Sequence, residues 1–183
     1  MKKFDKKKAM GWFIIIFMSL SVVGYMGGSF FTGATTFQEE TYNGYKFYNN
    51  SGWQLQYGEK QYYFNYYPSE LEYLTIPEVN LYESGKVYLA YQPEDEFSVN
   101  LYLQQLGSIF YINNFIPQQA CTVEEGCPDI PVIDCEEKTG IILLAGDNGF
   151  SKNNNCLVMK AENSQEMQKL TERLIYKLLG VMG

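Results

Sequence analysis

Histidine is absent from this sequence, and basic residues are few. The 183 residues contain no His, and 14 Lys and Arg stand against 21 Asp and Glu, for a net charge of −7. Without imidazole, the chain has no Ser-His-Asp or Cys-His catalytic group, no histidine metal site and no attachment site for a c-type haem. The acidic balance also argues against a nucleic-acid partner, because phosphate backbones are bound by clustered Lys and Arg.

Charge is missing altogether from one long stretch near the N-terminus. Residues 9–31 have no charged side chain, and five lysines lie in residues 1–8. At about 1.5 Å per residue, a helix of this length spans the roughly 30 Å hydrocarbon layer of a bilayer. Lysines directly before such a stretch favour a cytoplasmic N-terminus. We therefore expect a cytoplasmic tail over 1–8, a single transmembrane anchor over 9–31, and the rest of the chain outside the cytoplasm.

Two other interpretations fit the same apolar stretch. A cleaved signal peptide has an apolar core of about 7–15 residues followed by small residues; this stretch is longer, but the small and polar residues 33–36 offer a cleavage site. A buried helix of a soluble protein is the other interpretation. Within the stretch, Gly24 and Gly28 form a small-x-x-x-small pair that lets two membrane helices pack closely. Their alternative role is to loosen the end of the helix.

The charge balance reverses after the expected anchor. The first 31 residues carry five Lys and one Asp, whereas the remainder carries 9 basic and 20 acidic side chains. Such an acidic surface is well hydrated and is repelled by anionic lipid head groups. We expect a linker over 32–43, which is small and polar, and an extracytoplasmic domain over 44–183.

Tyrosine-rich segments with a two-residue alternation begin this domain. Residues 45–48, 53–57 and 61–67 have the pattern of half-buried strands separated by turn residues. We expect them to form an antiparallel meander with one packed face and one exposed face.

The exposed face of the meander is the candidate partner-binding surface. The alternation assigns Gln54, Gln56, Tyr63 and Tyr67 to it. Tyrosine and glutamine together can stack on sugars or anchor a protein partner. Cross-strand aromatic pairing within the sheet is the alternative interpretation.

The second half of the domain alternates strand and helix patterns. The expected elements are a strand at 86–91, a helix at 99–110, a parallel strand near 111–116 or 130–135, a loop at 117–129, and strands at 141–145 and 156–161 joined by a polar hairpin connection. A final amphipathic helix begins at Asn163 and ends at Gly180. Its polar side is expected to carry Lys169, Arg173 and Lys177. The fold class is therefore α+β: a transmembrane helix, an antiparallel meander and a β-α-β-β-α ectodomain.

Four cysteines lie in the outer domain, and an even number outside the cytoplasm indicates disulfides. Of the three pairings, we favour Cys121 with Cys127, which closes a small loop, and Cys135 with Cys156, which joins two strand ends. The longer bridge would contribute about 3 kcal/mol by restricting the unfolded chain. A catalytic dithiol normally has Cys-x-x-Cys spacing and a zinc site has Cys-x2–4-Cys spacing. Neither spacing occurs here.

Other polar clusters are interpreted as solvated surface. Acidic residues gather at 94–96, 124–125 and 134–137, but paired carboxylates act in glycoside hydrolysis only when the fold sets them across a cleft. The loop at 147–155 is rich in oxygen ligands but lacks the spacing of a calcium-binding loop. Asn49 begins an Asn-x-Ser sequon on an expected turn and is a glycosylation candidate.

Residues 86–180 resemble the thioredoxin-like folds in one respect. Ile130-Pro131-Val132 followed by a hairpin and a final helix is similar to the C-terminal half of that family, where a proline precedes the third strand. The resemblance implies a strand and helix at 86–110 as the first half, but Gln92-Pro93-Glu94-Asp95 stands where the family has Cys-x-x-Cys. Across its whole length the chain resembles uncharacterised single-span proteins of archaeal type, which implies no activity.

These observations predict a membrane-anchored extracytoplasmic binding or assembly module that is not catalytic and needs no cofactor or metal. Its expected partners are the lipid bilayer through 9–31 and either another protein or a second copy of the chain. One alternative is a divergent thioredoxin-like thiol–disulfide protein that uses Cys121 and Cys127. Another is an accessory subunit of a membrane complex.

Overall fold

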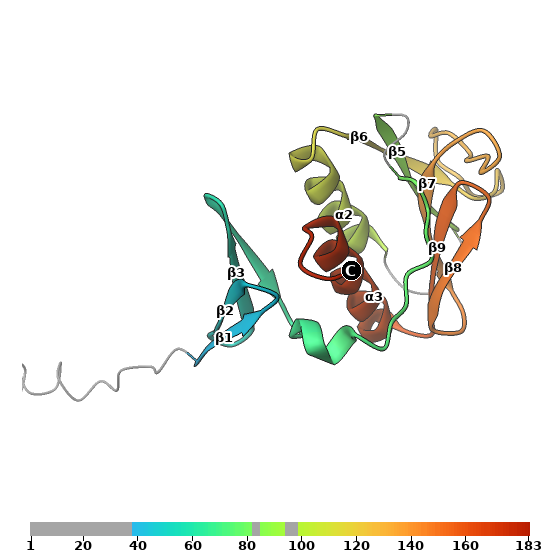
Figure 1. The fold of residues 1–183 in the computed structure, drawn as a ribbon. Helices are drawn as coiled ribbons and strands as arrows, with labels where there is room; N and C mark the ends of the chain where they lie inside the picture. The colour runs from blue at the N-terminus through green and yellow to red at the C-terminus, as the bar shows by residue number, and fades with distance from the viewer. Residues whose placement is uncertain (1–37, 82–84, 94–98) are drawn as a thin grey trace, which may run out of the picture. The chain divides into compact units, whose positions relative to one another are not determined.

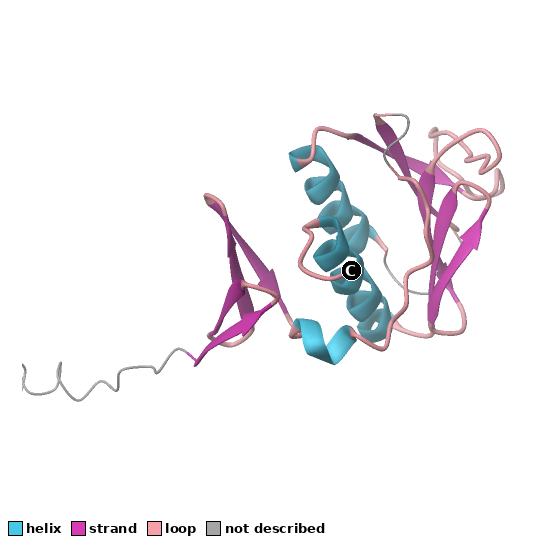
Figure 2. Cartoon of the chain, viewed as in Figure 1, coloured by secondary structure: helices cyan, strands magenta, loops and turns pink. Residues whose placement is uncertain are grey.

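The computed structural model describes residues 38–81, 85–93 and 99–183. These residues form two sheets and two α-helices, which confirms a mixed α+β fold (Figures 1 and 2). The expected tail and anchor over 1–31, with Gly24 and Gly28, lie outside the described residues. Within the described ranges, no helix combines the length and apolar character needed to cross a membrane.

The elements follow one another along the described chain in this order. They are β1 (Gln38–Tyr42), β2 (Tyr45–Asn49), β3 (Trp53–Tyr57), β4 (Lys60–Phe64), a short 3-10 helix (Pro68–Leu71), β5 (Lys86–Tyr91), α2 (Asn100–Ile112), β6 (Ile116–Cys121), β7 (Gly140–Ala145), β8 (Gly149–Asn153), β9 (Cys156–Ala161) and α3 (Ser164–Leu178).

The first sheet has the order β1-β2-β3-β4 and contains the expected meander. Its extra strand, β1, lies within residues predicted to be a linker. Asn43 and Gly44 both have positive φ values, of 48° and 84°, as a two-residue hairpin turn requires. An ion pair of 2.7 Å joins Lys46 of β2 to Glu39 of β1. Because β1 is an edge strand and mostly exposed, it lacks the apolar alternation by which strands are recognised.

The second sheet has the order β6-β5-β7-β9-β8. β5, α2 and β6 form a parallel β-α-β unit, and β6 lies where a loop was predicted at 117–129. The prediction was wrong because Pro117 and the polar Gln118 and Gln119 do not resemble a buried strand. Proline is tolerated here because β6 lies at the edge of the sheet, where a ladder hydrogen bond can be missing.

The connection between β7 and β9 also differs from the prediction. These strands run parallel, so they do not form the expected hairpin. The connecting residues contain β8, which is antiparallel to β9 and turns into it at Asn154 and Asn155. Asn154 has a φ of 50°, which asparagine adopts more readily than most residues. β8 was missed because Ser151, Lys152 and Asn153 are exposed and polar.

Both helices lie on the same side of the second sheet (Figure 2). Alternate residues of the central strands face them: Ile141 and Leu143 of β7 and Leu157 and Met159 of β9 belong to the main core. The intervening residues face the other side and contribute to a second, smaller apolar cluster that includes Ile142 and Val158. The continuous apolar runs in these strands follow from burial on both faces.

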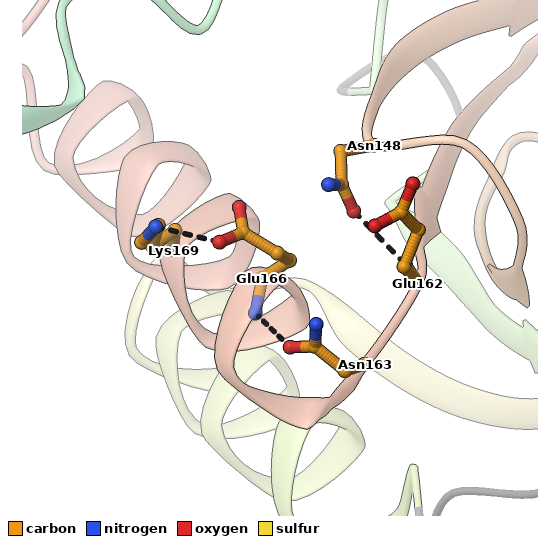
Figure 3. Close-up of polar contacts among 5 residues, drawn as sticks. All are labelled: Asn148, Glu162, Asn163, Glu166 and Lys169. Carbon is orange, nitrogen blue, oxygen red and sulfur yellow. Dashed lines mark hydrogen bonds and ion pairs between the residues drawn. The ribbon is translucent and has the colours of Figure 1, made fainter.

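Helix α3 begins as predicted (Figure 3). The Oδ1 atom of Asn163 accepts a hydrogen bond of 3.0 Å from the backbone N–H of Glu166, and Glu166 pairs with Lys169 at 2.6 Å. Just before the helix, the backbone N–H of Glu162 donates to Asn148 at 2.9 Å. The helical conformation ends at Gly180, where φ is 73°. These contacts agree with the predicted N-cap and C-terminal glycine.

The prediction that Arg173 lies on an exposed, polar side of α3 is wrong, because this residue is only 6% exposed. Its Nε atom donates to the carbonyl of Leu74 at 3.0 Å, and a second guanidinium nitrogen donates to the carbonyl of Gly183 at 2.6 Å. The first sheet packs on this side of the helix: the Tyr176 ring lies 5.9 Å from that of Phe47. A helix covered on two sides buries polar residues that a single apolar stripe would leave in water.

Candidate functional site

The outer face of the first sheet brings together most of the predicted binding residues. Gln54 of β3 lies opposite Tyr63 of β4, and Gln56 lies opposite Gln61. The Gln61 side chain donates to the Oε1 atom of Gln54 at 2.8 Å. Tyr63 is 69% exposed. We refer to Gln54, Gln56, Gln61 and Tyr63 as the amide–tyrosine face.

Tyr67 does not lie on this face. It is 8% exposed, and its ring centroid lies 4.4 Å from that of Trp53 and 5.3 Å from that of Phe47. The alternation fails because β4 ends at Phe64, after which the chain turns into the short 3-10 helix. Two neighbours on this side of the sheet were not assigned as binding residues from the sequence. They are Gln61 of β4, opposite Gln56, and Tyr48 of β2, opposite Gln54.

The helix-free face of the second sheet carries a groove of about 680 Å³. Its floor is apolar and consists of Ile142 and Leu144 of β7 and Val158 of β9. Ile142 lies opposite Val158, and Leu144 lies opposite Lys160. Because side chains alternate along a strand, all four point away from the helices.

One wall of the groove is formed by residues 131–139, which we call the cover segment. It joins the edge of the second sheet through two backbone hydrogen bonds of 2.9 Å, from Cys121 to Pro131 and from Ile133 to Cys121. A Cβ atom on Gly140 would lie 2.5 Å from the Cδ1 atom of Ile133 and 2.8 Å from the carbonyl oxygen of Tyr88. A glycine at this position therefore allows the cover segment to pack directly on the sheet.

The cover segment is also fastened at the turn between β8 and β9. Cys135 and Cys156 form a disulfide with a Cα–Cα distance of 5.4 Å. Beside it, the backbone N–H of Asn155 donates to the carbonyl of Cys135 at 3.0 Å, and its side chain donates to the carbonyl of Glu136 at 2.9 Å. One covalent bond and two hydrogen bonds thus fix the cover segment to Asn155 and Cys156 at the start of β9.

The groove carries opposite charges at its two ends. Asp134 and Glu136 flank Cys135 in the wall, and Lys160 lies on β9. Lys160 is four positions after Cys156, so these points on β9 are about 13 Å apart at about 3.3 Å per residue. Neither Lys46–Glu39 nor Lys169–Glu166, two ion pairs of the described residues, involves these three charges. The Oδ1 atom of Asp134 accepts a hydrogen bond of 2.9 Å from the backbone N–H of Glu136.

Only one feature of the amino-acid sequence points to this groove. Lys160 is the single charged residue in the apolar run of β9. Asp134 and Glu136 were interpreted as solvated surface, and they are exposed. The disulfide and the parallel pairing of β7 and β9 place all three residues on one groove, and no local pattern encodes this arrangement.

The second disulfide joins Cys121 and Cys127, so the predicted pairing of all four cysteines is confirmed. Cys121 ends β6 and is 0% exposed. The bridge closes a loop that contains Glu124 and Glu125. Thiolates are stabilised by helix N-termini and nearby cations, and this loop supplies neither.

A buried carboxylate on α3 was not foreseen from the sequence. Glu172 is 2% exposed and accepts hydrogen bonds from the backbone and side chain of Asn65, from the backbone of Tyr66 and from Gln168. Burial raises its pKa above the ordinary value of 4.5, and these hydrogen bonds act in the opposite direction. Three of these four donors belong to Asn65 and Tyr66, so Glu172 serves to hold the chain after β4.

The remaining candidates are dispersed. In the described ranges, no three His, Cys, Asp or Glu side chains gather as metal ligands would. The acidic residues 94–96 lie outside these ranges. Asn49 is the last residue of β2 and is half-buried.

Comparison with family models, curated proteins and solved structures finds no match for this chain. The features of this chain that bear on its function are therefore the amide–tyrosine face, the groove and the disulfides.

Proposed function

We propose that this chain is a membrane-anchored extracytoplasmic module that binds or assembles with a partner and catalyses no reaction. The five lysines followed by the uncharged residues 9–31 support a single anchor with a cytoplasmic N-terminus. Two disulfides support an oxidising compartment for the folded domain, because bridges of this kind are rare in the cytosol.

The observation that carries the binding role is the exposure of Tyr63 beside uncharged amides. Its side chain is 69% exposed, next to Gln54 across the strand register. A phenol offers a large apolar surface with a polar end, and glutamine offers both a donor and an acceptor. On an otherwise acidic domain, such an uncharged face suits a protein partner better than an anionic membrane surface.

Site-specific crosslinking in native membranes tests this role. A photoreactive amino acid replaces Tyr63 in one variant and Tyr111 in a matched control, because Tyr111 is 76% exposed but lies on α2. We expect the Tyr63 variant to capture a defined protein and the Tyr111 variant to capture little. Equal yields from both positions, or none from either, would contradict the proposal.

The identity of the captured protein separates the forms of the proposal. A second copy of the chain indicates a homo-oligomer, whereas several proteins of one assembly indicate an accessory subunit of a membrane complex. Extraction of the membranes with carbonate, followed by intact-mass measurement, tests the anchor in the same preparation. A retained anchor leaves the full-length mass in the membrane pellet, and cleavage near residues 33–36 releases a shorter chain.

Alkylation distinguishes this module from a divergent thioredoxin-like thiol–disulfide protein. Such an enzyme would need Cys121 and Cys127 to cycle, yet Cys121 is fully buried, so exchange would have to begin at Cys127. We expect denatured but unreduced protein to gain no alkyl group, because all four cysteines are bridged. A fraction carrying two alkyl groups on Cys121 and Cys127 would favour the enzyme.

A further inference from the structure

The groove has the features of a site prepared before its ligand arrives. Its wall is fastened by the disulfide between Cys135 and Cys156 and by two hydrogen bonds from Asn155. Its floor is part of a five-stranded sheet. Binding therefore requires little ordering of the protein, so little of the binding free energy is lost as conformational entropy.

The spacing of charge in the groove sets the length of the ligand. The acidic end, Asp134 and Glu136, lies next to the Cys135 bridge to Cys156, and Lys160 lies about 13 Å further along β9. An extended peptide advances by about 3.3 Å per residue, so two side chains four positions apart match this separation. The order of charges requires a basic group at the acidic end and a carboxylate near Lys160.

The floor and rim complete the match to an extended peptide. Ile142 and Val158 lie between the charged ends, and Leu144 lies beside Lys160. Together they form an apolar surface for a central aliphatic side chain. Amide and hydroxyl groups on the rim, from Gln92, Ser151 and Asn153, can pair with peptide N–H and C=O groups. The described residues that line the groove include no aromatic ring, so a sugar would find no surface to stack on.

We propose that this groove binds an extended peptide segment of about five residues, basic at one end, acidic at the other and aliphatic at the centre. The segment lies along β9, with its basic group at Asp134 and Glu136 and its acidic group at Lys160. This site is separate from the amide–tyrosine face, so either proposal can fail while the other stands.

Fluorescence polarisation with the full-length protein in detergent tests the site. The probe is the end-capped, labelled peptide Lys-Ala-Leu-Ala-Glu; the comparison peptides are Gln-Ala-Leu-Ala-Gln and Lys-Ala-Leu-Ala-Lys. Both chain directions are tested by including Glu-Ala-Leu-Ala-Lys. We expect the probe or its reversed form to bind about tenfold more tightly than the uncharged peptide, with an advantage that decreases as salt is added.

Two matched lysine substitutions locate the binding. Lys160→Glu reverses the charge in the groove, whereas Lys152→Glu makes the same change on exposed β8, outside the groove lining. We expect Lys160→Glu to weaken binding of the mixed-charge peptide about tenfold, and this variant should bind Lys-Ala-Leu-Ala-Lys more tightly than the mixed-charge peptide. The affinity of Lys152→Glu should stay within about twofold of wild type. Circular dichroism of both variants checks that the fold is kept.

Three results would overturn the proposal. The first is equal binding of the charged and uncharged peptides, and the second is an equal effect of the two lysine substitutions. The third is displacement of the probe by maltotriose at a lower concentration than by unlabelled peptide, which would assign the groove to a neutral glycan.

Discussion

The carboxylate of Glu172 on α3 accepts a hydrogen bond of 2.9 Å from the backbone N–H of Asn65, which lies 107 positions earlier in the chain. The same carboxylate accepts from the side chain of Asn65 and from the backbone of Tyr66. These bonds satisfy the N–H groups that are exposed when β4 ends at Phe64. Glu172 thus fixes the point at which the first sheet meets the final helix.

We expect Glu172→Gln to lower the free energy of unfolding by about 1–3 kcal/mol near neutral pH. In glutamine, an NH2 group replaces one of the two carboxylate oxygens and would face the N–H of Tyr66 or Asn65. A buried N–H donor would then have no acceptor. Urea denaturation measures the change. The control is Glu59→Gln in the exposed turn between β3 and β4, which should have almost no effect; equal losses in the two variants would assign no special role to Glu172.

The raised pKa of Glu172 predicts how stability depends on pH. The folded state holds this proton more tightly than the unfolded state, whose ordinary value is 4.5. The stability that the folded state gains by holding this proton is fully present below pH 4.5. It is lost as pH rises through the raised pKa of Glu172 in the folded state. We expect the stability difference between wild type and Glu172→Gln to shrink as pH rises from about 4.5. A difference that grows over this range would show that hydrogen bonding outweighs burial.

The two disulfides should contribute unequally to stability. Cys135 and Cys156 are 21 positions apart, whereas Cys121 and Cys127 are 6 apart. Restriction of the unfolded chain predicts losses of about 3 and about 2 kcal/mol when each pair is replaced by serine. Thermal or urea unfolding of the two double variants measures this order. The reverse order would mean that strain or residual structure dominates over loop length.

A pair of glycine substitutions tests the close packing of the cover segment. In Gly140→Ala the new Cβ atom would lie 2.5 Å from the Cδ1 atom of Ile133 in the cover segment and 2.8 Å from the carbonyl oxygen of Tyr88 on β5, so we expect a loss of about 1–3 kcal/mol. In Gly107→Ala on α2 the nearest atom lies 3.6 Å away, on Leu89, so the helix should gain up to about 1 kcal/mol. Denaturation midpoints report both changes. A stable Gly140→Ala variant would mean that the cover segment shifts easily, and the groove would then not be rigid.

Much of the fold is predictable where a segment carries its own pattern. β3, β5 and β9 have the bounds expected from the sequence, since their alternating or continuous apolar residues are typical of strands. Helix α3 follows from its cap at Asn163 and its apolar stripe. β1, β6 and β8 were not predicted because they lie at sheet edges, where polar residues and proline are tolerated.

The candidate sites divide in the same way. Gln54, Gln56 and Tyr63 share a face because the alternation within β3 and β4 places them there, while Tyr67 lies beyond the end of the strand. The groove could not be predicted, because Asp134 and Lys160 are distant in sequence. Their position on one groove depends on the Cys135–Cys156 bridge and on the parallel pairing of β7 and β9, which are separated in the chain by β8.

The amino-acid sequence alone established the absence of imidazole chemistry, the acidic balance of residues 32–183 and the type of most buried elements, and it favoured one of three possible cysteine pairings. These properties depend on composition, spacing and local periodicity, which act over a few residues. The parallel pairing of β7 and β9, the burial of Glu172 and Arg173, and the charged groove on the helix-free face became visible only in the folded chain. Each of these depends on which surfaces cover one another, and that is set by packing between segments far apart in the chain.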